Sequence, residues 1–161
     1  MLTIDKVYSA KNVLKKVIRK TSVIPAFDLS DTNHIYLKTE NLQRTGSFKI
    51  RGSYFKISRL TEEEKARGII ASSAGNHAQG VALAAQQEGI KCTICMPDNA
   101  PISKIEATKS YGAEVCLAQG AYDEAYALAA KMAEEKGYTF VHPYDDEDVI
   151  AGQGTIGLEI L

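Results

Sequence analysis

A lysine beside a phenylalanine and between two arginines stands out in the stretch RTGSFKIRGS, residues 44–53. The residues from about Ser47 onward predict a helix, which would place Lys49 in its first turn. There the Lys49 ammonium would meet the positive end of the helix dipole, and Arg44 and Arg51 would add like charge. Each influence favours the neutral amine, so we expect a lowered pKa and an amine that can condense with an aldehyde. Alone, a lysine at a helix start is more often a solvated charge.

A second polar stretch, SSAGNHAQG at residues 72–80, follows an apolar run and opens a predicted helix. Where a strand ends and a helix starts, backbone N–H groups and the helix dipole favour an anion, and a substrate carboxylate is a natural occupant. Gly75 would let the backbone approach a ligand closely, while Asn76 and His77 add directional polar groups. The alternative interpretation is an ordinary helix cap with an incidental histidine.

The elements that must position these residues follow a βαβ alternation, which predicts an α/β fold with a parallel sheet. Four apolar runs read as strands and start near Ile69, Cys92, Glu114 and Thr139. Three helical stretches separate them, and each of these stretches ends at a glycine. We therefore expect a four-stranded unit with helices on its faces from about Gly68 to Asp145.

The segments outside this α/β unit have a less regular pattern of apolar residues. Apolar spacing predicts a helix from about Ile4 to Ile18, and the stretches SVIPAF and HIYLKTEN read as extended. Thr61 and Glu64 have the spacing of a capping box ahead of another helix. At the end, DEDVIAGQGTIGLEIL reads as one helix whose apolar positions are still running at Leu161. We expect from this that the chain is the front part of a longer protein.

Composition disfavours several classes of protein. The chain of 161 residues carries 19 Lys and Arg against 20 Asp and Glu, without a basic stripe that would hold nucleic acid. No apolar run reaches the roughly 18 residues of a membrane span. Three cysteines without an export signal fit a reducing compartment, so we expect a soluble, cytoplasmic protein.

Two short motifs in the chain have structural interpretations. Cys92 and Cys95 form a C-x-x-C within a predicted strand, where positions three apart point to opposite faces, so we expect core residues and no metal site. Gly152, Gly154 and Gly157 form a G-x-G-x-x-G that lacks the preceding strand of a dinucleotide site. Close helix packing by small residues is the favoured reading there.

Two long motifs carry a resemblance to a known family. KTENLQRTGSFKIRG, followed by ASSAGNHAQGVA, resembles the pyridoxal-phosphate enzymes of the tryptophan synthase β-like superfamily, and within it the threonine dehydratase (threonine ammonia-lyase) family. HIYLKTEN, ICMP, YGAEV and IAGQGTIGLEIL are also similar to that family, so the resemblance covers nearly the whole chain. Two such motifs in the right order make a chance match improbable.

The resemblance assigns roles to particular residues. It implies that Lys49 is the catalytic residue that holds pyridoxal 5'-phosphate as a Schiff base and later moves the substrate's α proton. Phe48 would pack beside the cofactor, and Asn76 would hydrogen-bond its phenolic oxygen. The substrate carboxylate would be held by one loop, made of Ser73, Ala74, Gly75, Asn76 and His77.

The implied reaction is dehydration and deamination of L-threonine or L-serine to 2-oxobutanoate or pyruvate and ammonia. Threonine synthases resemble SFKDRG at the lysine and cysteine synthases resemble TSGNTG, whereas this chain has Ile50 and SAGNHAQG. Serine racemases tend to read SSGNH, with a second serine placed for proton transfer. Ala74 stands at that position here and has no proton to give, which disfavours racemisation. A serine racemase-like enzyme remains the alternative within the superfamily.

The resemblance also implies parts that this sequence lacks. No G-G-G-G-like loop for the cofactor phosphate occurs in the chain. We expect residues 1–67 and 146–161 to form an incomplete large cofactor domain and residues 68–145 to form the small α/β domain. Such a chain would bind the cofactor poorly or not at all alone and would be inactive alone. At full length we expect a homo-oligomer.

Other readings remain open on the residues alone. One is a non-catalytic α/β module that binds a nucleotide or a protein partner, with the 72–80 stretch as an anion cradle. Some short catabolic threonine dehydratases are activated by adenine nucleotides, so a nucleotide effector is also compatible with the family. A further alternative is that the α/β unit folds alone and the residues before Gly68 stay partly disordered.

Overall fold

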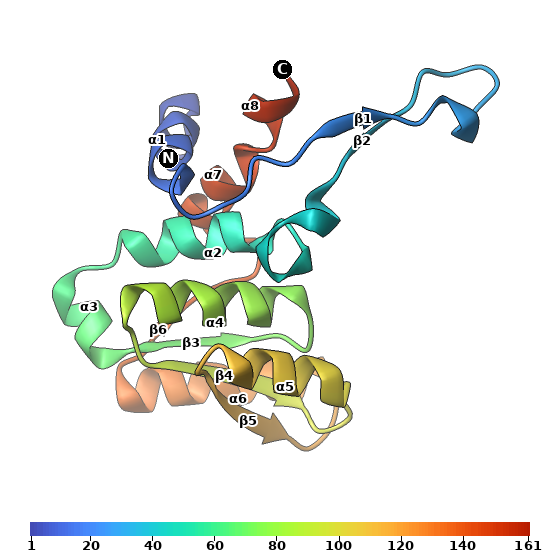
Figure 1. The fold of residues 1–161 in the computed structure, drawn as a ribbon. Coiled ribbons are helices and arrows are strands. Elements are labelled where there is room, and N and C mark those ends of the chain that lie inside the picture. The colour runs from blue at the N-terminus through green and yellow to red at the C-terminus, as the bar shows by residue number, and fades with distance from the viewer.

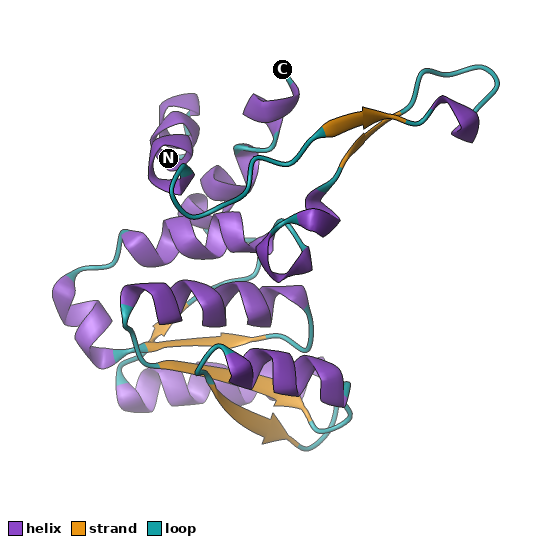
Figure 2. Ribbon diagram, viewed as in Figure 1, coloured by secondary structure: helices purple, strands orange, loops and turns teal.

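Four parallel strands form the central sheet of this computed structural model, which describes residues 1–161 (Figures 1 and 2). The strand order is β5-β4-β3-β6. The strands are β3 (Ile69–Ser72), β4 (Cys92–Pro97), β5 (Glu114–Ala118) and β6 (Thr139–Phe140). The α/β class, the parallel sheet and the four predicted strand starts are thus confirmed. Every residue of β3 and β4 is buried, as expected for strands covered on both faces.

Helices cover both faces of this sheet. On one face lie α4 (Asn76–Glu88) and α5 (Ile102–Ser110), and α6 (Tyr122–Lys136) packs on the other (Figure 1). Glycines with positive φ follow all three helices, with 67° at Gly89, 82° at Gly112 and 69° at Gly137. Because glycine alone adopts this conformation without strain, these residues end the helices where the sequence predicts.

The first part of the chain contains short elements around one central helix. Two helices, α2 (Lys49–Ser58) and α3 (Glu62–Arg67), follow a first helix, α1 (Ile4–Leu14). The predicted end of α1 at Ile18 is wrong, since the Leu14 carbonyl accepts from the N–H groups of both Val17 and Ile18 and closes the helix in a turn. The capping box of Thr61 and Glu64 is confirmed.

An antiparallel ribbon of two strands, β1 (Val23–Pro25) and β2 (Tyr36–Lys38), extends away from the helices (Figure 2). Its apolar side chains are largely exposed, with Ile24 and Leu37 both 42% exposed. One short 3₁₀ turn, Phe27–Leu29, lies in the loop between the two strands, and two more follow the ribbon at Glu40–Leu42 and Arg44–Gly46. No helix of the chain is both long and apolar enough to cross a bilayer.

The predicted C-terminal helix is in fact two helices, α7 (Glu147–Gly154) and α8 (Gly157–Ile160). Asp146 caps α7 by accepting from the N–H groups of Asp148 and Val149. The Thr155 hydroxyl donates to the Gly152 carbonyl at 2.7 Å at the end of α7. A hydroxyl that bonds to the backbone in this way competes with the helix ladder, which accounts for the interruption that apolar spacing did not predict.

Helix α2 lies between α4 and α7 (Figure 1). Its side chains Ile50, Phe55 and Ile57 are fully buried, so the segment before Gly68 is packed into the fold. A Cβ atom at Gly152 would lie 2.6 Å from the Arg51 carbonyl oxygen, and one at Gly52 would lie 2.7 Å from the Val149 carbonyl oxygen. Helices α2 and α7 therefore cross at these two glycines. The close-packing interpretation is confirmed for Gly152.

The two cysteines of the C-x-x-C lie as the strand pattern predicts. Cys92 belongs to the hydrophobic cluster on the α4 side of the sheet, and Cys95 belongs to the cluster on the α6 side. Burial raises the pKa of both thiols to about 12. Both are therefore protonated core residues.

Candidate active site

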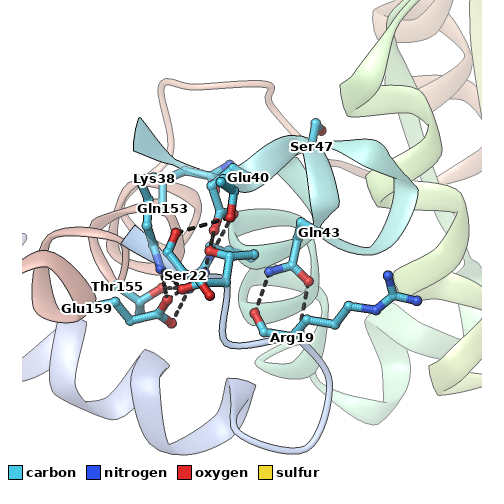
Figure 3. A network of polar contacts seen from close by, with 12 residues as sticks. Arg19, Ser22, Lys38, Glu40, Gln43, Ser47, Gln153, Thr155 and Glu159 are labelled. Atoms are coloured by element: carbon cyan, nitrogen blue, oxygen red, sulfur yellow. Dashed lines mark hydrogen bonds and ion pairs between the residues drawn. The ribbon is translucent and has the colours of Figure 1, made fainter. Parts of the chain in front are cut away.

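The chain turns sharply just before Lys49. Thr45 and Gly46 have φ values of 64° and 69°, so two successive residues adopt the left-handed conformation. For the β-branched Thr45 this conformation is strained, and such strain persists only where the surroundings impose it. The buried Gln43 supplies part of that constraint, because its amide bonds to both backbone groups of Arg19 at 2.8 and 2.7 Å (Figure 3).

Lys49 is the first residue of α2, close to the predicted start, and its side chain is half-buried. Its Nζ donates to the Pro143 carbonyl oxygen at 2.8 Å, and lies 5.4 Å from the centroid of the Phe48 ring. No carboxylate pairs with it. Burial lowers the pKa of Lys49, which confirms the predicted direction. The shift favours the neutral form of the amine.

Burial is the cause of this lowered pKa, and the predicted contribution of Arg51 is wrong because Arg51 is engaged elsewhere. The Arg51 side chain is fully buried and pairs with Glu40 and Glu159, each at 2.7 Å. Burial opposes the charge of Arg51, but these two carboxylates hold its pKa above the ordinary value. Figure 3 shows Lys38, Glu40, Thr155 and Glu159 converging in this network, in which Lys38 also pairs with Glu159 at 2.6 Å. Arg51 therefore anchors α2.

The loop predicted to hold a carboxylate joins β3 to α4. The Ser73 hydroxyl accepts from the Gly75 N–H at 3.1 Å, and Ser73, Ala74 and Gly75 are half-buried. A Cβ atom at Gly75 would meet nothing within 4 Å, so open space lies over this part of the backbone. Asn76, the first residue of α4, is exposed.

His77 lies inside the structure. Its Nε2 is 3.0 Å from the Val141 carbonyl oxygen, whereas its Nδ1 is buried without a partner. Burial lowers the pKa of His77 to about 4, with the nearby charges of Lys49 and His142 acting in the same direction. The imidazole is thus neutral at pH 7 and carries its proton on Nε2, the atom that faces a carbonyl. The side chain is thus a structural contact between α4 and the segment after β6, and its role in holding a carboxylate stays a prediction.

The two motifs meet in the structure. A Cβ atom at Gly80 would lie 3.1 Å from both the Lys49 carbonyl carbon and the Ile50 nitrogen, so α4 approaches the start of α2 closely because residue 80 is a glycine. The segment after β6 joins them on another side, since its Val141 and Pro143 carbonyls accept from His77 and Lys49. Lys49 therefore lies beside the N-terminal half of α4.

Two residues that contact the predicted site residues were not predicted from the sequence. They are Pro143, which contacts Lys49, and Lys104, which contacts Asn76. The backbone carbonyl of Pro143 has no sequence signal. Lys104 donates to Asn76 Oδ1 at 3.2 Å, and the order of the elements could have found it. Helices α4 and α5 follow strands that are parallel neighbours, so both helices begin at the same edge of the sheet.

Over residues 14–161, the chain matches the family described as "Pyridoxal-phosphate dependent enzyme". The chain belongs to this family. It is 55% identical over 163 residues to the L-threonine ammonia-lyase of Thermotoga maritima, covering 100% of this chain and 41% of that protein.

Solved structures of similar proteins have the same fold. Maize serine racemase superposes with a TM-score of 0.94 at 33% identity, over 99% of this chain and 49% of that one. Threonine deaminase isoform 2 from Solanum lycopersicum gives a TM-score of 0.87 at 40% identity, over 97% and 48%. The chain thus spans about half the length of these relatives. The threonine dehydratase resemblance is confirmed at the level of the family and its named members.

The residues of this chain fit the aldehyde end of the family's cofactor, pyridoxal phosphate. Pyridoxal phosphate needs a primary amine that is not neutralised by a carboxylate, and Lys49 meets that requirement. Phe48, 37% exposed, presents an apolar ring beside that amine. Asn76 presents an exposed amide at the start of α4. These observations concern the aldehyde end of the cofactor, and none of these residues forms a phosphate site.

Proposed function

We propose that this chain is the front part of a pyridoxal-phosphate dependent ammonia-lyase that dehydrates and deaminates L-threonine or L-serine. The observation that carries the proposal is the half-buried amine of Lys49, which pairs with no carboxylate and lies beside the N-terminal half of α4. The similarity to a protein named L-threonine ammonia-lyase supports the same substrate class. Family membership weighs against the alternative of a non-catalytic nucleotide-binding module.

Each residue has a defined task in this proposal. The cofactor ring, when bound, supplies the electron sink for the carbanion that forms at the substrate α carbon. Lys49 would hold the cofactor through its Nζ and, once that atom is released, carry the α proton. Asn76 would donate to the phenolic oxygen of the ring, with Phe48 beside it. The N–H groups at the start of α4, in the loop Ser73–His77, would hold the substrate carboxylate.

The division of the chain into domains is part of the proposal. Residues 68–145 would be the small domain, and residues 1–67 and 146–161 would belong to the large one, completed by a later segment that brings the phosphate loop. The exposed apolar side chains of the β1–β2 ribbon support this division, because a completed domain would cover them. We expect a cytoplasmic homo-oligomer at full length, with weak cofactor binding by this chain alone.

The test is an assay of the full-length enzyme for 2-oxobutanoate from L-threonine and pyruvate from L-serine. We expect activity that Lys49→Ala abolishes and that Lys131→Ala, an exposed lysine on α6, leaves intact. Inactive wild-type enzyme, or an active Lys49→Ala enzyme, would refute the proposal. Adding an adenine nucleotide to the same assay tests for an effector.

Serine racemisation is the second candidate, favoured by the superposition on maize serine racemase. Ala74 offers no hydroxyl that could carry a proton to the opposite face of the substrate. Chiral analysis of the serine left after reaction decides between the two. We expect L-serine to be consumed without D-serine, and accumulation of D-serine would reverse the assignment.

A further inference from the structure

A lysine outside both sequence motifs fixes the orientation of Asn76. The Nζ atom of Lys104 lies 3.2 Å from Asn76 Oδ1. An ammonium group has only donors, so the amide atom that faces it must be the oxygen. The amide NH₂ of Asn76 is therefore turned away from Lys104. An asparagine without such a neighbour could present either atom.

Lys104 lies in the first turn of α5, and its backbone groups are hydrogen-bonded. Its backbone N–H donates to the Pro101 carbonyl at 2.9 Å, and its carbonyl accepts from the buried Thr108 hydroxyl at 2.8 Å. Its side chain is half-buried and pairs with no carboxylate. By contrast, Lys109 on the same helix pairs with Glu106 at 3.2 Å. The ammonium of Lys104 is thus a cation whose positive charge is not compensated.

Lys104 lies near the carboxyl edge of the sheet, in the first turn of the helix that follows β4. Strands β3 and β4 are parallel, so the helices that follow them, α4 and α5, both begin at the carboxyl edge of the sheet and pack together. Ligands of open α/β sheets bind at this edge. Lys104 extends from α5 to the first residue of α4, the residue expected to contact the cofactor ring.

We propose that Lys104 is a positioning residue of the pyridoxal-phosphate site, which orients the Asn76 amide so that its NH₂ donates to the phenolic oxygen of the ring. Its charge also favours the anionic form of that oxygen, because a nearby cation stabilises an anion. The inference rests on the proposed function and adds a residue that neither motif contains. The orientation of the Asn76 amide then depends on both α4, which carries Asn76, and α5, which carries Lys104.

The test compares Lys104→Met, Asn76→Ala and the double variant in the full-length enzyme, with Lys109→Met as the matched control on α5. The first readout is the absorbance of bound pyridoxal phosphate. In Lys104→Met we expect the visible band to fall and the near-ultraviolet band to rise, since the phenolic oxygen loses stabilisation of its anion. The second readout is cofactor affinity, which should weaken roughly three- to ten-fold, the worth of one hydrogen bond.

A positioning role acts through Asn76, so Lys104→Met should add nothing in the Asn76→Ala background. A spectrum and affinity unchanged by Lys104→Met, or effects that add fully in the double variant, would overturn the inference. The same changes in Lys109→Met would overturn it too, as a general charge effect. Failure of wild-type enzyme to bind the cofactor at Lys49 would instead refute the proposed function.

Discussion

The pKa of Lys49 is lowered by burial, and no carboxylate pairs with its amine. Its position in the sequence predicts the direction of the pKa shift, since a helix start disfavours an ammonium group. The physical cause could not be predicted, because burial depends on how α4 and the 141–143 segment pack around the side chain. For Arg51 the gap is larger. Its partners, Glu40 and Glu159, are distant in sequence, and no local pattern links them.

His77 makes stability depend on pH. Its pKa is about 4 in the folded protein against an ordinary value of 6.5. Between these values the unfolded chain binds a proton that the folded chain does not, so the free energy of unfolding falls as pH falls from 6.5 to 4. The contribution amounts to roughly 3 kcal/mol at the low end.

His77→Gln keeps a donor for the Val141 carbonyl and removes the titration. We therefore expect a shallower fall of the free energy of unfolding over this pH range, measured by urea unfolding at several pH values. A slope equal to that of the wild type would show that His77 does not titrate as its burial requires. Such a result would mean that the His77 imidazole is more exposed in solution than in the structure.

At the scale of elements, glycines set how closely α2 approaches its neighbours. The sequence predicts the existence and order of the strands and helices of the sheet, because apolar runs, glycine stops and turn residues are local signals. The ends of α1 at Leu14 and of α7 at Gly154 were not predicted. They depend on backbone bonds and hydroxyl contacts that apolar spacing does not encode.

Gly152→Ala should be strongly destabilising. The new Cβ would lie 2.6 Å from the Arg51 carbonyl oxygen and from Gly52 Cα, backbone atoms that cannot move without shifting α2. We expect a loss of about 1–3 kcal/mol in the free energy of unfolding.

Gly157→Ala is the matched control for Gly152→Ala, since nothing lies within 4 Å of a Cβ at Gly157 and its φ is not positive. It should be neutral or slightly stabilising. Equal stability of the two alanine variants would contradict the close crossing of α2 and α7. Thermal or urea unfolding of both variants measures the difference.

At the scale of the whole molecule, the Arg51 network joins three parts of the chain. Arg51 on α2 pairs with Glu40 after the β1–β2 ribbon and with Glu159 on α8. The Thr21 hydroxyl also donates to Glu40, at 2.6 Å. The helix that carries Lys49 is thereby fixed to both chain segments of the predicted large domain. The position of the Lys49 amine therefore depends on contacts that Lys49 itself does not make.

Arg51→Met should cost about 3–5 kcal/mol, because it leaves two nearly buried carboxylates without their main partner. Arg59→Met is the control, since the Arg59 side chain is 53% exposed and its contact with Asp148 is longer, at 3.5 Å. That change should cost less than about 1 kcal/mol. Comparable losses in the two variants would show that the buried network is not a main source of stability.

The pH dependence of the Arg51→Met effect is a separate prediction. Burial opposes the charge of Glu40 and Glu159, but their bonds to Arg51 lower both pKa values below the ordinary 4.5. The stabilisation they provide is complete above pH 4.5 and is lost as the pH falls through the lowered values. The difference between wild type and Arg51→Met should therefore narrow on acidification. A constant or widening difference would contradict this account of the network.

Reduction of the full-length enzyme with borohydride in the presence of pyridoxal phosphate tests the central claim most directly. Borohydride fixes the cofactor on the lysine that holds it, and peptide mapping then identifies that lysine. The geometry predicts a single pyridoxyl label on Lys49, absent from Lys49→Ala. A label on another lysine, or none on the wild-type enzyme, would contradict the assignment of the active site.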